Sequence, residues 1–389
     1  MDLLVDILIL LVVAKIGGEI AEHFNYPSII GELFGGILVG PTFVGAVAIE
    51  GGIERFAYIG ILLLMFLAGT ETSVSDLSKT GKTSVIMAFM GVAVPFALGF
   101  GACRAWGYGF YGSLFVGTAL SATSVGISVR VLYELGELRS LIGSTILGSA
   151  ILDDIISVVL VTIISGAAIS GNVSVVAMAK VLALMVAFFA IAYVFMRVFV
   201  VRAMRLIQSF RTESAVESWA LILVLAFAIL AEEMYVAGIT GSFVAGMVVA
   251  RTPEKNIIIT NSKVIGYAFF IPFFFASIGA QVDMAEFMDA GTLGLLIIVV
   301  AIVGKVFAGF LACKASRLPN DIALVIGTGM IPRMEVALVI GNIGVATGVL
   351  GQSLYSSIII MAFATTLVTP PLLKLLIRRV HDSGSSHLL

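Results

Sequence analysis

Two acidic residues stand side by side in an apolar stretch of the chain, Asp153 and Asp154 in the segment GSAILDDIISVVL. Neighbours on a helix point about 100° apart, so the two carboxylates face different partners. Loss of solvent and mutual repulsion both disfavour two bare charges at such a place. The pair is therefore suited to hold protons or a small hard cation in turn.

Three hydroxyls are placed to assist these carboxylates. Thr123 and Ser124 lie in the polar segment SATSVGIS, and Ser149 comes one helical turn before Asp153. Hydroxyl oxygens offer lone pairs to a cation as well as hydrogen bonds. We expect Asp154, Asp153, Thr123, Ser124 and Ser149 to form one ion- and proton-binding site.

Three further charges fall inside apolar segments, namely Lys305 in AIVGKVFAGF and Arg333 and Glu335 in GTGMIPRMEV. A charge at the centre of a membrane span costs roughly 2.5–3.5 kcal/mol, so each one requires a partner or a function. Lys305 is expected either to pair with an aspartate or to be neutral. A bridge to Asp153 that opens when the aspartate is protonated would couple transport to protons, and a static salt bridge is the alternative. For Arg333 and Glu335 we favour a structural role at helix ends.

The composition places these charges in a membrane protein. Apolar residues make up 60% of the 389 residues and charged residues only 12%, about half of the usual charged fraction of soluble domains. The apolar runs are continuous and about 20 residues long, which indicates helices rather than barrel strands. We predict an all-α polytopic membrane protein. Its expected partners are the lipid bilayer, monovalent cations and protons, with no cofactor and no nucleic acid.

Thirteen transmembrane helices are predicted along the chain. Their centres lie near Leu11, Gly35, Leu64, Gly91, Thr123, Asp154, Phe188, Val224, Ala245, Phe273, Val300, Glu335 and Thr366. An odd number of spans places the termini on opposite sides, and Lys and Arg concentrate in cytoplasmic loops. With the N-terminus outside, the inner loops hold basic residues that include Lys79, Lys82, Arg130, Arg139, Arg202, Arg205, Arg211 and Lys263. The outer side holds few, so we expect an outside N-terminus and a cytoplasmic C-terminus.

The fifth and twelfth predicted helices contain polar, glycine-rich or proline-containing stretches at mid-depth. Such stretches indicate unwound, broken helices. The two stand seven helices apart, and an odd spacing reverses their direction through the membrane. We therefore predict an inverted repeat with two broken crossing helices. Transporters of this kind bind their substrate where the two breaks meet.

With these residues in view, the chain resembles the monovalent cation:proton antiporter-2 family over nearly its whole length. The order and spacing of several motifs carry the resemblance. They are PSIIGELFGGILVGP (27–41), FLAGTET, SATSVGISV, LDD, ITGSFVAGMVVARTP (239–253), IPFFFASIGAQVD (271–283), MIPRMEVALVI and TTLVTPPLL (365–373). Met334 departs from the pattern, because many relatives have Gly between the Arg and the Glu.

The resemblance implies a domain plan and a division of roles. A core domain for ion translocation would cover about 83–169 and 291–379, and a dimerisation domain about 1–74 and 214–281. A linker helix would cover about 175–210, all within one transporter unit of 389 residues. Asp154 would be the principal ion and proton carrier, while Asp153 would pair with Lys305. A homodimer in a prokaryotic inner membrane is also implied.

The function that we predict is a secondary antiporter and not an enzyme. It would exchange cytoplasmic Na⁺ or Li⁺ for external H⁺ by alternating access, electrogenically if two protons move per sodium ion. Exchange of K⁺ for H⁺ on the same fold stays open, and a cation channel is a more distant alternative. An intramembrane aspartyl protease is discounted, because adjacent aspartates on one helix cannot flank a scissile bond symmetrically.

Overall fold

The computed structural model describes residues 2–47, 49, 51–170, 175–200 and 215–382. All regular elements in these ranges are helices, and no strand occurs there. Apolar runs fold this way because hydrocarbon offers the backbone no outside hydrogen-bond partner. Among the described residues, eight helices are long and apolar enough to cross a membrane, and a bent pair raises the number to nine. The predicted all-α polytopic membrane fold is confirmed.

The count of thirteen spans stays a prediction. Every predicted centre lies within a helix except Thr123, which lies in a break. However, α2 (Ser28–Val39) and α11 (Gly238–Val249) contain only 12 residues each. At 1.5 Å per residue each is about 18 Å long, shorter than a hydrocarbon core of about 30 Å. They are apolar helices whose length alone does not identify a span.

The chain divides into two compact units. Unit 1 comprises Met1–Ser75 and Ala179–Val282, and unit 2 comprises Asp76–Met178 and Asp283–Leu389. Unit 1 contains most of α8 and the helices α1 (Asp2–His23), α2, α3 (Gly51–Glu71), α10 (Ala215–Glu233), α11, α12 (Lys255–Ile265) and α13 (Ile271–Ala280). Helix α8 (Val175–Val194) continues into η1 (Phe195–Phe199), and η2 (Gly266–Phe270) joins α12 to α13.

Close helix packing in unit 1 depends on small residues. Helix α1 packs on α2, and α2 packs on α13. A Cβ atom at Gly31 of α2 would overlap the carbonyl oxygen of Gly17 in α1. Glycine at this crossing lets the two backbones touch, as is common between membrane helices.

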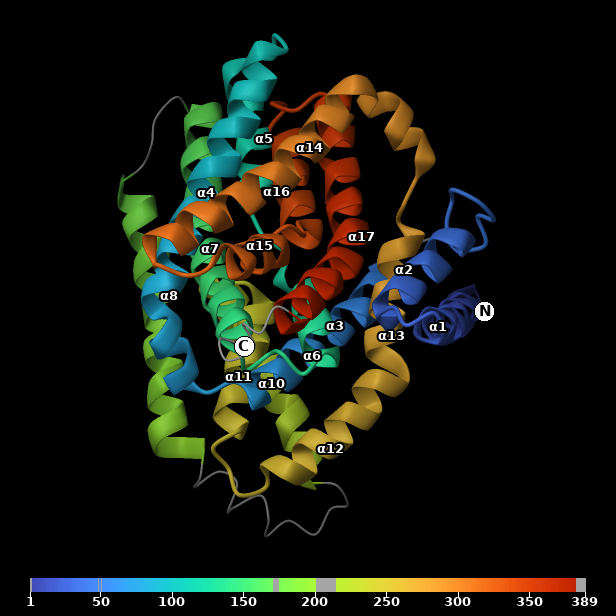
Figure 1. Cartoon of the computed structure of the whole chain (residues 1–389), viewed down its shortest axis with the longest axis vertical. Coiled ribbons are helices and arrows are strands. Elements are labelled where there is room, and N and C mark those ends of the chain that lie inside the picture. Colours follow the sequence, from blue (N-terminus) through green and yellow to red (C-terminus); the bar gives the residue numbers. More distant parts are fainter. Residues whose placement is uncertain (1, 48, 50, 171–174, 201–214, 383–389) are drawn as a thin grey trace. The chain divides into compact units, whose positions relative to one another are not determined.

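Unit 2 holds all the sequence-predicted site residues. Its helices are α4 (Val74–Ala105), α5 (Phe110–Ser121), α6 (Val125–Glu134), α7 (Leu141–Ser170), α14 (Met284–Ala315), α15 (Asn320–Gly329), α16 (Met334–Ala346) and α17 (Gln352–Asp382). Helices α14 and α17 run side by side, and α15 packs against both (Figure 1). Helix α14 bends at Gly291, whose positive φ of 55° suits a residue without a side chain.

Two helices of unit 2 are interrupted where the sequence predicts it. Residues 122–124 separate α5 from α6, and residues 330–333 separate α15 from α16, with a bend of 52° at the second break. The order long helix, interrupted helix, long helix thus occurs twice, as α4–α5/α6–α7 and as α14–α15/α16–α17. The inverted orientation of the two sets stays a prediction.

The predicted domain roles also stay predictions. Residues 201–210 of the predicted linker helix and residue 214, where the second dimerisation segment begins, lie outside the described residues. So do three of the basic residues used for the orientation, Arg202, Arg205 and Arg211.

Candidate ion-binding site

The two helix breaks lie against each other inside unit 2. The backbone N–H of Ser124 in the first break donates to the carbonyl oxygen of Pro332 in the second, at 2.8 Å. One turn into α6, the Ser128 hydroxyl donates to the carbonyl oxygen of Gly329 at 2.6 Å. Unwound backbone at membrane depth needs such partners, because no water is available to it there. Each break therefore satisfies polar groups of the other.

Beside the breaks, Lys305, Asp153 and Thr123 form a closed triangle of hydrogen bonds. The Lys305 ammonium lies 2.8 Å from Asp153 Oδ2 and 2.7 Å from Thr123 Oγ1. The Thr123 hydroxyl in turn donates to the same Asp153 oxygen at 2.5 Å. The side chains of Lys305 and Asp153 are both 0% exposed. The structure thus brings together three predicted site residues from α14, α7 and the first break.

Helix α4 contributes Gly91 to this site, where a residue without a side chain leaves space for Lys305 and Asp153. A Cβ atom at Gly91 would lie 3.3 Å from Lys305 Nζ and 3.8 Å from Asp153 Oδ1. That second aspartate oxygen is buried and has no hydrogen-bond partner among the described residues. Gly91 carried no functional signal in the sequence, because a glycine in an apolar helix reads as ordinary packing.

Asp154 follows Asp153 on α7 and is also buried, with 7% of its surface exposed. Because successive helical residues point about 100° apart, its carboxylate points in a different direction from that of Asp153. The predicted helper Ser149 is fully buried, and its hydroxyl donates to the Thr145 carbonyl of its own helix at 2.6 Å. With its proton donated to Thr145, the Ser149 oxygen can still coordinate a cation through its lone pairs.

Ser157 is a buried hydroxyl outside the set of predicted site residues. It lies one turn after the aspartate pair on α7, and its Oγ has no hydrogen-bond partner within the described part of the chain. The spacing of three and four residues from Asp154 and Asp153 places it on their side of the helix. That spacing was the signal that could have identified it.

Arg333 is fully buried in the second break and is directed at main-chain oxygens. Its Nε donates to the carbonyl oxygen of Leu120, near the C-terminal end of α5, at 2.6 Å. Its Nη2 donates to the carbonyl oxygen of Ala301 in α14 at 3.1 Å. A third donates to Ile331 of its own break. Carbonyls at the end of a helix lack helical partners, so a guanidinium is well matched to them.

Glu335 lies in the first turn of α16 and accepts a hydrogen bond from the hydroxyl of Ser124. Ser124, which the sequence suggested as an ion ligand, is therefore held by the second break through its backbone and by α16 through its side chain. The buried polar centre of unit 2 thus contains carboxylates, hydroxyls and one ammonium. Such a set can exchange a proton for a hard monovalent cation.

Comparison with known proteins supplies the family. A family model described as "Sodium/hydrogen exchanger, transmembrane" matches residues 7–379. The chain belongs to the sodium/hydrogen exchanger family. The resemblance to monovalent cation:proton antiporters is thereby confirmed at the level of the family.

Several antiporters are similar to the chain over nearly its full length. The Na(+)/H(+) antiporter of Enterococcus hirae is 34% identical over 374 residues, which cover 96% of this chain and 97% of that protein. The Na(+)/H(+)-K(+) antiporter GerN of Bacillus cereus is 31% identical and covers 95% of both. The solved structure of the sodium proton antiporter MjNhaP1 from Methanocaldococcus jannaschii has a TM-score of 0.70 at 17% identity, covering 97% of this chain and 99% of that one. It shows a shared fold.

Proposed function

We propose that this chain is an antiporter that exchanges cytoplasmic Na⁺ or Li⁺ for external H⁺ by alternating access. The buried Lys305–Asp153 pair next to Asp154, at the meeting point of two helix breaks, is the observation that carries the proposal. Relatives named Na(+)/H(+) antiporters, similar over their whole length, support the choice of ions. Intramembrane charges in such a place are functional by default.

In this proposal Asp154 binds the cation and the proton alternately, and Asp153 exchanges its bond to Lys305 for a proton. Thr123 stabilises the pair when it is closed, because it contacts both partners. Residues 83–169 and 291–379 form the moving core. Two protons move in one direction for each cation that moves in the other, so each cycle transfers a net charge across the membrane and the exchange is electrogenic.

The direct test is transport by purified protein in liposomes across a pH series. An imposed gradient of Na⁺ or Li⁺ should drive proton movement in the opposite direction, and an imposed membrane potential should change its rate. No cation-driven proton movement at any pH would contradict the proposal. A rate that does not respond to potential would contradict the electrogenic part alone.

Exchange of K⁺ for H⁺ is the second candidate. It is favoured by the similarity to GerN, which is named a Na(+)/H(+)-K(+) antiporter. The same liposomes with a K⁺ gradient distinguish the two cations. Proton flux driven by K⁺ but not by Na⁺ would replace the first proposal by the second.

The membrane and the orientation belong to the proposal as well. We place the chain in the prokaryotic inner membrane with the N-terminus outside and the C-terminus in the cytoplasm, because most basic loop residues then lie inside. In intact cells, a thiol reagent that does not cross the membrane should label a single cysteine introduced as Glu54→Cys but not one introduced as Lys79→Cys. The reverse pattern would contradict this orientation.

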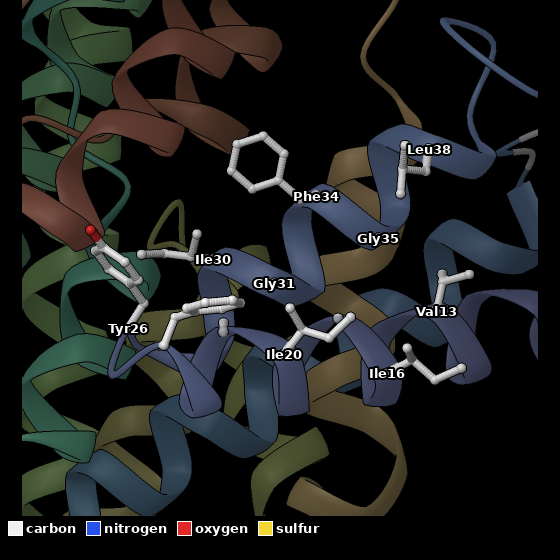
Figure 2. A pocket seen from close by; sticks show the side chains of 12 residues that line it. Val13, Ile16, Ile20, Tyr26, Ile30, Gly31, Phe34, Gly35 and Leu38 are labelled. Carbon is white, nitrogen blue, oxygen red and sulfur yellow. The ribbon is translucent and has the colours of Figure 1, made fainter.

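A homodimer completes the proposal, and unit 1 has a surface that suits it. An apolar groove of about 430 Å³ runs along α1 and α2, and Figure 2 shows Ile16, Ile20 and Phe34 beside it. Phe34 is 53% exposed. The groove lies within residues 1–74, for which the family resemblance implies dimerisation, so we assign it to a second copy of the chain.

Cysteine cross-linking tests this assignment, since both native cysteines are buried. Phe34→Cys in liposomes should link two copies. Val85→Cys in α4, which is 57% exposed and apolar but remote in sequence from the groove, serves as the control. Equal cross-linking from both variants, or none from Phe34→Cys, would mean that lipid alone covers the groove.

A further inference from the structure

Glu335 is an acidic side chain whose charge the neighbouring arginine does not offset. Its Oε2 accepts from Ser124, and its Oε1 is buried with no hydrogen-bond partner in the described ranges. Arg333 directs its guanidinium to three main-chain carbonyls instead. A buried intramembrane carboxylate is costly, and a structural contact to a hydroxyl needs no charge. Glu335 therefore requires a functional explanation.

Ser124 is the residue of the first break that hydrogen-bonds to the Glu335 carboxylate, and it is held at two points. Its backbone donates to Pro332 at 2.8 Å while its hydroxyl donates to Glu335. A carboxylate presents acceptors on both oxygens and makes stronger hydrogen bonds than a neutral oxygen. Whatever displaces Glu335 consequently displaces Ser124.

Thr123 transmits such a displacement to the ion site. It precedes Ser124 in the extended break, and Cα atoms of successive residues are fixed about 3.8 Å apart. Its hydroxyl accepts from Lys305 at 2.7 Å and donates to Asp153 at 2.5 Å. A shift of a few tenths of an ångström at Ser124 therefore alters the geometry of the buried pair.

We propose that Glu335 is a positioning residue of the ion site, which sets the apparent Na⁺ affinity by holding Ser124 and thereby Thr123. This inference rests on the proposed antiport function. This role differs from general stabilisation of the two breaks, because it depends on one hydrogen bond, from the Ser124 hydroxyl to Glu335.

Ser128 provides a matched control for that distinction. It also links the two interrupted helices, because its hydroxyl in α6 donates to the Gly329 carbonyl at the end of α15 at 2.6 Å, and it is fully buried. It contacts neither Glu335 nor the Lys305–Asp153 pair in any described hydrogen bond. General loosening of the breaks would act through Ser128 as much as through Ser124.

The experiment measures Na⁺-driven proton movement in proteoliposomes as a function of Na⁺ concentration. Glu335→Ala and Ser124→Ala should each raise KM for Na⁺ about three- to tenfold, the usual effect of losing one ordinary hydrogen bond. The maximal rate should stay within about twofold. The double variant should be no worse than the more affected single variant. Glu335→Gln, which keeps an acceptor oxygen, should fall between wild type and Glu335→Ala, and Ser128→Ala should keep the wild-type KM.

Four results would overturn the inference. The first is an unchanged KM in Glu335→Ala, and the second is a KM increase in the double variant equal to the product of the two single increases. The third is a KM in Glu335→Gln no closer to the wild-type value than that of Glu335→Ala. The fourth is a KM increase in Ser128→Ala equal to that in Ser124→Ala. If Glu335→Ala does not fold, Ser124→Ala and Glu335→Gln carry the test, and a wild-type KM in both overturns it. Wild-type protein without Na⁺-driven proton movement would instead refute the proposed function itself.

Discussion

Lys305 and Asp153 form a salt bridge at 2.8 Å with neither side chain exposed to solvent. The residues are 152 positions apart in the chain and meet because α14 and α7 both border the broken helices. Two buried charges repay their desolvation only when geometry is good and further hydrogen bonds are present. Thr123 supplies such a bond to each partner. Removing one charge should therefore cost more than the pair contributes.

Asp153→Asn should lower the free energy of unfolding by roughly 3–5 kcal/mol, because it leaves the Lys305 ammonium buried without a counter-charge. Thermal unfolding of purified protein in detergent measures the effect. Asp289→Asn, at an exposed acid of α14, should leave the midpoint unchanged. The double variant Asp153→Asn/Lys305→Met should regain most of the loss. Identical midpoints for wild type and Asp153→Asn would show that the pair is not closed.

Gly91→Ala should impair transport more than stability. The added methyl group would lie 3.3 Å from Lys305 Nζ, so the lysine must move by a few tenths of an ångström. Misplacement on that scale reduces rates well before it unfolds a protein. We expect at least a threefold loss of Na⁺-driven exchange in liposomes. Gly101→Ala in the same helix, where nothing lies within 4 Å of the new atom, should behave as wild type. Equal activity of the two variants would contradict the proposed role of Gly91.

Arg333→Lys should destabilise the fold although it keeps the positive charge. A lysine ammonium cannot reproduce a planar fork that serves the carbonyls of Leu120, Ile331 and Ala301 together. Each buried carbonyl left unsatisfied costs about 1–3 kcal/mol. The yield of folded protein and its midpoint of thermal unfolding should both fall. A wild-type midpoint for Arg333→Lys would mean that the guanidinium geometry is dispensable.

The sequence predicted the fold class and the polar centre well, because hydrocarbon imposes simple rules. Long apolar runs must be helices, and polar stretches at SATSVGIS and GTGMIPRMEV must be breaks. Intramembrane charges are rare enough that Lys305 and Asp153 could be selected without a structure. The residues alone suggested Asp153 as one partner for Lys305, and the family resemblance selected that pair, since a deep lysine alone does not identify its acid.

Other features of the site could not be predicted, for reasons that are physical. The bond of Ser124 to Glu335 joins residues 211 positions apart, and no local pattern encodes which break a hydroxyl faces. Ser149 stays a predicted ion ligand, but no local pattern indicated that its hydroxyl donates to the carbonyl four residues earlier, as a serine inside a helix can. Gly91 contributes by lacking a side chain, which no search for reactive groups detects.

The role proposed for Asp154 is to carry the cation and the proton. Its most direct test is the addition of Na⁺ outside proteoliposomes that contain a pH-sensitive dye, with wild type and Asp154→Asn reconstituted at equal density. Wild type should make the lumen more alkaline as Na⁺ enters and H⁺ leaves, Asp289→Asn should match it, and Asp154→Asn should give no more signal than empty liposomes. Full exchange by Asp154→Asn would contradict the assignment of the carrier.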